Sequence, residues 1–97
     1  MTELQNLQQQ MTACGIPSYM QGGLLRYIVN HIEPGSFLSA VLCNNLKEAV
    51  ACADEVNRNM LCNYVFFLYN YAPSQCWGSA HRVEKWLENA EPENDNG

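Results

Sequence analysis

The sequence predicts an all-α protein, a compact single-domain bundle of five or six short helices. Apolar residues recur at spacings of three and four along most of the chain, and capping residues, Pro and Gly separate these segments at short intervals. Hydrophobic residues make up 47% of the 97 residues, which is enough for one packed core. We therefore expect one helical domain over residues 1–90 and a disordered acidic tail over residues 91–97.

The first two predicted helices cover residues 2–14 and 17–32. Gly15 is expected to end the first, and Pro17 to begin the second. Pro34 disfavours helical backbone at the residue before it, so the second helix should end there. The first stripe comprises Leu4, Leu7, Met11 and Cys14, and the second comprises Tyr19, Leu24, Tyr27, Ile28 and Ile32.

The region 36–53 is predicted to form two short helices that bend at Asn44 and Asn45. Ser36 is a candidate N-cap for the first of them, and Asn45 with Glu48 matches a capping box for the second. The apolar positions stay on one side throughout. They are Phe37, Leu38, Val41, Leu42, Leu46, Ala49, Val50 and Ala53.

The longest predicted helix covers residues 55–71, with Asp54 as its N-cap. This helix is apolar nearly all round after residue 60, as expected for the centre of a core or for an oligomer interface. Its apolar positions are Val56, Met60, Leu61, Tyr64, Val65, Phe67, Leu68 and Tyr71. A loop follows, and Ser79 is expected to cap a last helix that reaches residue 90.

Two adjacent glycines, Gly22 and Gly23, lie inside the second predicted helix, where each costs about 1 kcal/mol relative to alanine. Helical spacing places Gly22, Arg26 and Asn30 in one row on the helix surface. The room above the glycines suits either a second packed helix or a planar or charged group held by Arg26. The sequence leaves both interpretations open.

Charge and cysteine content exclude several classes of function. The formal net charge is -5 with only five Lys and Arg, so we expect no nucleic-acid partner, although a small anion stays possible. The longest apolar run is far shorter than the ~20 residues of a membrane span, and the Gln-rich start is unlike a signal peptide. The five cysteines form no C-x-x-C pair, which indicates free thiols. We expect a cytoplasmic protein with no membrane partner, metal or cofactor.

No catalytic set can be identified, so the sequence predicts a binding protein and not an enzyme. Gly35-Ser36 and Gly78-Ser79 have the composition of helix N-termini that hold phosphates, although an ordinary Ser N-cap gives the same pattern. Aromatic rings could stack on a base or fill the core, and amides could bind a ligand or face solvent. The candidate ligand-binding residues are Arg26, Tyr27, Asn30, Ser36, Phe37, Asn44, Asn57, Trp77 and Ser79.

The segments "GGLLRYIVNHIEPGSFLSAVLCNNLKEA", "FLYNYAP" and "WGS", with Ala53, Asp54 and Asn57, resemble a family of short proteins encoded by tailed phages and prophages. The resemblance covers about residues 16–87. Position 45 is commonly aspartate in that family and is asparagine here. The resemblance implies a phage protein, and some small phage proteins sequester nucleotide immune signals, such as cyclic dinucleotides or cyclic ADP-ribose derivatives, inside compact oligomers.

These observations together predict an anti-defence protein that binds and sequesters a nucleotide-derived small molecule without catalysis. A homo-oligomer is expected, and a dimer is favoured. The alternative is a small protein-binding inhibitor or adaptor of a host protein that acts through an acidic and aromatic surface. The dense acidic run is confined to residues 91–97, which weakens this alternative.

Overall fold

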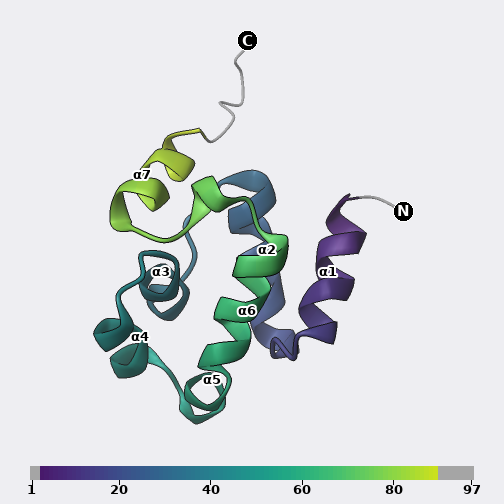
Figure 1. The fold of residues 1–97 in the computed structure, drawn as a ribbon, viewed down its shortest axis with the longest axis vertical. Coiled ribbons are helices and arrows are strands. Elements are labelled where there is room, and N and C mark those ends of the chain that lie inside the picture. Colours follow the sequence, from purple (N-terminus) through teal and green to yellow (C-terminus); the bar gives the residue numbers. More distant parts are fainter. Residues whose placement is uncertain (1–2, 90–97) are drawn as a thin grey trace.

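The computed structural model describes residues 3–89, which form seven α-helices and one 3₁₀ turn and contain no strand (Figure 1). The predicted all-α class is confirmed. The helices are α1 Glu3–Ala13, α2 Ser18–Asn30, α3 Ser36–Leu42, α4 Leu46–Cys52, α5 Glu55–Asn59, α6 Leu61–Tyr71 and α7 Ala80–Glu88, with the 3₁₀ turn η1 at Ser74–Cys76. The predicted disordered tail, residues 91–97, lies outside the described residues.

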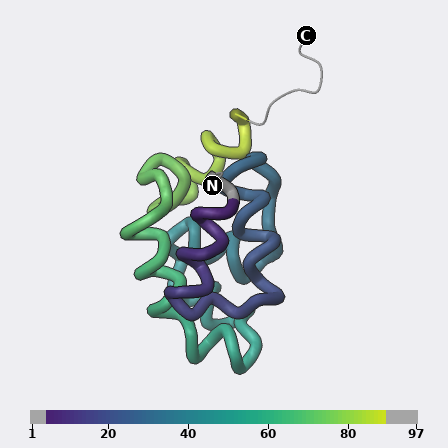
Figure 2. Tube along the Cα trace, turned by 90° about the vertical axis from the view of Figure 1, so that its right-hand side faces the viewer, coloured from purple at the N-terminus to yellow at the C-terminus, as the bar shows by residue number. Residues whose placement is uncertain are grey.

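Helix α6 occupies the centre of the bundle, between α1 on one side and the α3–α4 pair on the other (Figure 1). In the view turned by 90°, α1 lies in front of α2 and α6, and it packs against both of them (Figure 2). Helix α7 closes the end of the bundle opposite α5, where it packs against α3 and η1. Six of the seven helices contribute apolar side chains to a single core, and α5 contributes the buried polar Asn57.

The core is built from the inward sides of α2, α3 and α6. Tyr27, Tyr64 and Phe67 are fully buried and are its largest side chains. Phe37 packs edge-on against Tyr64, with ring centroids 5.2 Å apart. Each fully buried apolar side chain of this kind stabilises the fold by about 1.5–3 kcal/mol. The central parts of the predicted stripes are therefore core, as expected.

Helix ends follow the capping residues of the sequence at most boundaries. Gly15 has φ +85°, and the N–H of Ile16 donates to the Met11 carbonyl, the Schellman arrangement that ends α1. The side chains of Asn45, Asp54 and Ser79 each accept a hydrogen bond from the backbone N–H three residues later. These three predicted caps and the predicted end at Gly15 are confirmed.

Three predicted boundaries are wrong. The helix expected over 55–71 breaks at Met60, after an Asn-rich turn of weak helix formers. The helix expected over 17–32 ends at Asn30, because His31 adopts a left-handed conformation with φ 59°. Ser36 is the first residue of α3 and not its cap, since Gly35 takes the N-cap position and no side chain caps this end.

Several side chains predicted for buried stripes are instead exposed. Each helix of a small bundle buries only part of its surface, so residues at the margins of the stripes predicted for residues 17–32 and 55–71 face solvent. They are Tyr19, Ile32, Val56, Val65 and Tyr71.

Candidate functional site

Three of the nine candidate ligand-binding residues lie in the core. Tyr27 is fully buried and donates a hydrogen bond from its hydroxyl to the Cys76 carbonyl at 2.7 Å. Asn57 is 4% exposed, and its Oδ1 accepts from the Tyr64 hydroxyl at 2.6 Å. Phe37 is 6% exposed. These three side chains hold the fold together, and a ligand on the surface does not reach them.

Burial also fixes the protonation of the two core tyrosines. Desolvation raises the pKa of Tyr27 and of Tyr64 above the ordinary value for a phenol. Both hydroxyls therefore remain protonated donors. This is the state that their bonds to the Cys76 carbonyl and to Asn57 require.

The two predicted phosphate sites lie at opposite ends of α3. Ser36 begins α3, whereas the N–H of Gly78, next to Ser79, donates to the carbonyl of Leu42 at the last residue of α3. Six residues of helix separate these ends by about 9 Å, at 1.5 Å per residue. Ser79 also uses its hydroxyl oxygen to cap α7, where it accepts from the Arg82 N–H. The structure therefore does not combine Ser36 and Ser79 in one cradle.

The surface beside Ser36 is acidic. A hollow of about 500 Å³ runs along the start of α3, and Glu33, Glu48 and Ser36 are among the residues that line it. Carboxylates repel a phosphate at short range, because the like charges are only partly screened by water. The start of α3 is thus poorly suited to bind an anion.

The room above Gly22 is occupied by the Arg26 side chain of the same helix. A Cβ added at Gly22 would lie 3.2 Å from Arg26 Nη1, and a Cβ at Gly23 would lie 3.7 Å from Leu38 Cδ1. Gly22 therefore makes room for the guanidinium, and Gly23 faces α3. In residues 3–89, Arg26 has no ion-pair partner, and its side chain is exposed.

The other candidates are dispersed over the surface. Asn30 ends α2 and is exposed. Asn44 is exposed in the turn after α3, with φ 62°. Trp77 is half-buried against the core. The structure therefore brings Arg26 and Asn30 to one helix but forms no single pocket from the nine residues.

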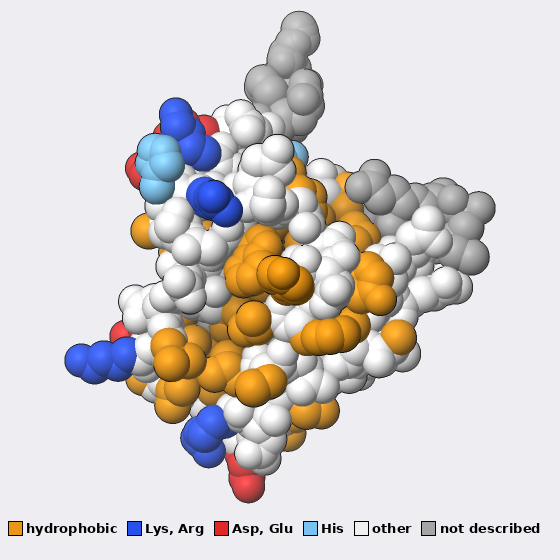
Figure 3. Space-filling view, in the orientation of Figure 1, with side chains coloured by type: hydrophobic (Ala, Val, Ile, Leu, Met, Phe, Trp, Pro, Cys, Tyr) orange, Lys and Arg blue, Asp and Glu red, His pale blue; other side chains and the backbone are white. Residues whose placement is uncertain are grey.

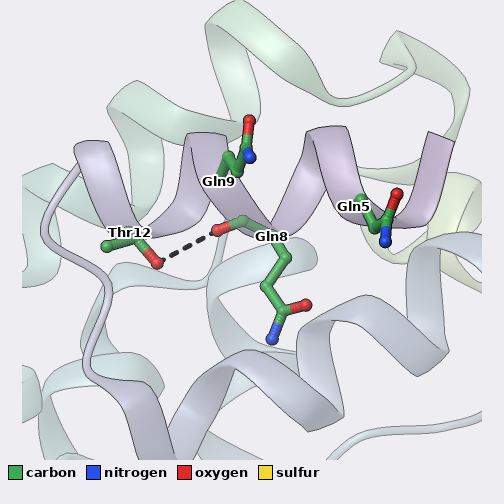
Figure 4. A pocket seen from close by; sticks show the side chains of 4 residues that line it. All are labelled: Gln5, Gln8, Gln9 and Thr12. Atoms are coloured by element: carbon green, nitrogen blue, oxygen red, sulfur yellow. Dashed lines mark hydrogen bonds between the residues drawn. The ribbon is translucent and has the colours of Figure 1, made fainter. Parts of the chain in front are cut away.

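A hollow of about 500 Å³ lies on the polar face of α1, lined by Gln5, Gln8, Gln9 and Thr12. Its described lining residues all come from one helix, and the side chains of Gln8 and Gln9 point to opposite sides of α1 (Figure 4). Thr12 donates to the backbone carbonyl of Gln8 at 3.1 Å. The polar groups do not converge on a common point, so the hollow lacks the features of a ligand site.

An exposed apolar surface lies on α6. Val65, Phe66 and Tyr69 are 43%, 58% and 78% exposed, and Cys62 is exposed as well. These four residues occupy positions i, i+3, i+4 and i+7 and form one apolar stripe. Its opposite side, with Tyr64 and Phe67, is in the core. Helix α6 therefore has two apolar sides, and one of them faces solvent.

Helix α4 lies beside this stripe, and the two helices together line a groove. Leu46, 67% exposed, lies with the α6 side chains around a groove of about 450 Å³. Val50, one turn later on α4, is 41% exposed. Hydrophobic side chains gather over α6 and toward α4 in the space-filling view (Figure 3). We define the α4–α6 surface as Leu46, Val50, Leu61, Cys62, Val65, Phe66 and Tyr69.

None of the candidate residues named from the sequence belongs to the α4–α6 surface. The apolarity of α6 on all sides predicted a core helix or an interface, but the sequence did not indicate which side the core would take. The repeat of the i, i+3, i+4 spacing on two sides of one helix is the signal that could have located this surface.

The described part of the chain shows neither a metal site nor a membrane-spanning helix. No group of three or more His, Cys, Asp or Glu side chains within residues 3–89 is placed to hold a metal ion. None of the helices described there combines the length and the apolarity that crossing a bilayer requires.

Comparisons with protein-family models, with curated proteins and with solved structures find no match to this chain. The class of protein is therefore defined by its fold and by the α4–α6 surface alone. The chain is a small all-α domain with a contiguous apolar surface on α4 and α6.

Proposed function

We propose that this protein acts by binding another protein chain, which it contacts through the α4–α6 surface. The observation that carries the proposal is the second, solvent-facing apolar side of α6. Contiguous apolar surface of this kind is unfavourable in water unless a partner covers it, and it commonly marks protein interaction sites. Binding of this type needs no catalytic group.

Site-specific photo-crosslinking in cells tests the proposal. A benzophenone amino acid in place of Tyr69 should give adducts of defined mass. The same amino acid in place of Ile32, which is 49% exposed but lies after α2, should give none. Adding Phe66→Glu should abolish the adducts from position 69. The absence of adducts at position 69, or equal adducts at both positions, contradicts the proposal.

The proposed setting is the cytoplasm of a phage-infected cell, and its support is the resemblance to the phage family. The acidic tail offers a second route to partner binding in that setting. A chain that ends at residue 89 distinguishes the two routes. It should keep its crosslinks from position 69 if the α4–α6 surface is the binding site, and it should lose them if the tail is required.

A second candidate function is the sequestration of a nucleotide-derived molecule, favoured by the exposed guanidinium of Arg26. This group has no ion-pair partner within the described residues and lies over Gly22, on the same helix as exposed Asn30. A guanidinium so placed can donate two parallel hydrogen bonds to a phosphate.

Calorimetry with a panel of cyclic dinucleotides and cyclic ADP-ribose derivatives tests this second function. The wild type should bind one of them, and Arg26→Ala should lose at least tenfold in affinity. Arg26→Lys, which keeps the charge but loses the planar fork, should lose less than Arg26→Ala. Lack of binding by the wild type contradicts the proposal.

A further inference from the structure

The α4–α6 surface is uncharged, and this property restricts which partner it fits. Helix α6 contains no acidic or basic residue, and the described residues that line the groove are apolar side chains and a cysteine. A partner that relied on charge complementarity would find no counter-charge in the groove. The surface suits a partner that is itself apolar and uncharged along a helix.

The same surface on another molecule of this protein meets that requirement. A two-fold axis pairs identical patches, so a surface without charge avoids the like-charge repulsion that a net charge of -5 would otherwise cause. The stripe of Cys62, Val65 and Phe66 has the ridge spacing with which two helices interdigitate.

The exposed apolar area is of the size that pairing needs. An aromatic side chain carries about 150–250 Å², so the exposed fractions of Phe66 and Tyr69 correspond to about 200–340 Å². The smallest stable interfaces bury ~600 Å² on each partner, so these two rings supply about one third to one half of that area. Leu46, Val50 and Val65 add further exposed apolar surface.

We infer that the partner on the α4–α6 surface is a second copy of this chain, with α6 of each copy packed on α6 and α4 of the other about a two-fold axis. This inference rests on the proposed function, since it names the protein that the surface binds. Cys62 of each copy then lies on the side of α6 that the other copy covers.

Light scattering after size exclusion tests the inference directly. The wild type should have twice the mass of one chain, and the double variant Phe66→Glu/Tyr69→Glu should have the mass of one chain. Ile32→Glu changes an exposed apolar residue away from the surface and should stay dimeric. Circular dichroism establishes that the double variant is folded. A monomeric wild type up to millimolar concentration, or a double variant that stays dimeric, overturns the inference.

Cysteine crosslinking gives a second readout on the wild-type fold. A short bis-maleimide, which adds one thiol to each of its two double bonds, should join two copies through Cys62. Cys62→Ser should lose this product, whereas Cys52→Ser, which changes an exposed cysteine of α4 outside the surface, should keep it. A product that survives Cys62→Ser overturns the inference.

The outcomes separate the inference from the proposed function. A monomeric wild type that still gives crosslinks from position 69 to a different protein overturns the second copy but supports protein binding. A monomer without any crosslinks from position 69 overturns both.

Discussion

His31 and Trp86 fasten the last helix, α7, to the end of α2. The Nδ1–H of His31 donates to the Trp86 carbonyl at 2.8 Å, because a carbonyl oxygen can only accept. The indole Nε1–H of Trp86 donates in return to the Tyr27 carbonyl at 2.9 Å, and the two rings lie 4.4 Å apart. The left-handed conformation of His31, which ends α2, brings its ring to this position.

This pair of bonds predicts that Trp86→Phe loosens α7. The variant keeps an aromatic ring but leaves the Tyr27 carbonyl without the indole donor, so the free energy of unfolding should fall by about 1 kcal/mol. Trp77→Phe is the matched control, since the Trp77 indole makes no hydrogen bond within the described residues. Urea denaturation measures the free energy of unfolding of both variants. Equal losses for the two would show that the bond to Tyr27 adds nothing to packing.

Replacement of Gly22 and of Gly15 by alanine should have opposite effects on the free energy of unfolding. Gly22→Ala should raise the free energy of unfolding by about 0.5–1 kcal/mol, because alanine favours the helix and Arg26 Nη1, the flexible end of a side chain, can move aside. Gly15→Ala should destabilise by about 1 kcal/mol or more, because φ is +85° and the new Cβ would lie 2.7 Å from Asn63 Nδ2.

Thermal unfolding of the two alanine variants measures both effects. A decrease in stability for Gly22→Ala would indicate that a neighbour other than Arg26 requires the glycine. The second helix considered from the sequence is one such neighbour.

Tyr64→Phe should lower the free energy of unfolding by about 1–3 kcal/mol. The variant removes the donor to Asn57 Oδ1 and leaves this buried oxygen unsatisfied. Tyr71→Phe changes a tyrosine that is 43% exposed and lies outside the α4–α6 surface, and it should change stability by less than about 0.5 kcal/mol. Denaturant unfolding of both variants tests the contrast, which fails if Tyr64→Phe is as mild as its control.

We expect the free energy of unfolding to fall in acid, when the Asp54 carboxylate becomes protonated. The Asn57 N–H and then the Tyr19 hydroxyl, each 2.7 Å from the carboxylate, lower the pKa of Asp54 below its ordinary 3.8. Because the pKa of Asp54 is lower in the folded state, the ionised carboxylate stabilises the fold. This contribution to the free energy of unfolding is fully present above pH 3.8 and disappears as the pH falls through the folded-state pKa.

The control for this pH effect is Asp54→Asn, which keeps a capping oxygen but cannot ionise. Unfolding curves at neutral pH should show the wild type to be the more stable protein, and the difference should shrink toward zero as the carboxylate becomes protonated. A difference that stays constant with pH would contradict the role of the charge.

The residues that predicted helix boundaries correctly act through their nearest neighbours. Asn45, Asp54 and Ser79 cap the backbone three residues ahead, and Gly15 adopts a left-handed conformation that other residues resist. Local chemistry of this kind can be read from a single sequence. The break at Met60 is an exception: weak helix formers precede it locally, and the Tyr64 hydroxyl donates to Asn57 across it.

The exposure of the candidate ligand-binding residues, by contrast, does not follow from local sequence. Tyr27, Phe37 and Asn57 have the side-chain chemistry of a ligand site, yet the bundle buries all three. Arg26 is exposed and has no ion-pair partner within the described residues, and Asn30 and Asn44 are exposed as well. The exposure of an aromatic or an amide depends on which neighbours pack over it, and this information is not local.

The sequence by itself determined the all-α class, most helix ends and the central part of the core, because helical periodicity and capping depend on residues a few positions apart. It also determined that α6 would be apolar all round. Only the tertiary structure decided that Arg26 fills the space above Gly22, and that the core takes the Tyr64 side of α6 and leaves the Phe66 side in water. The physical reason is that a small bundle has one interior, and the packing of all its helices together selects which apolar face occupies it.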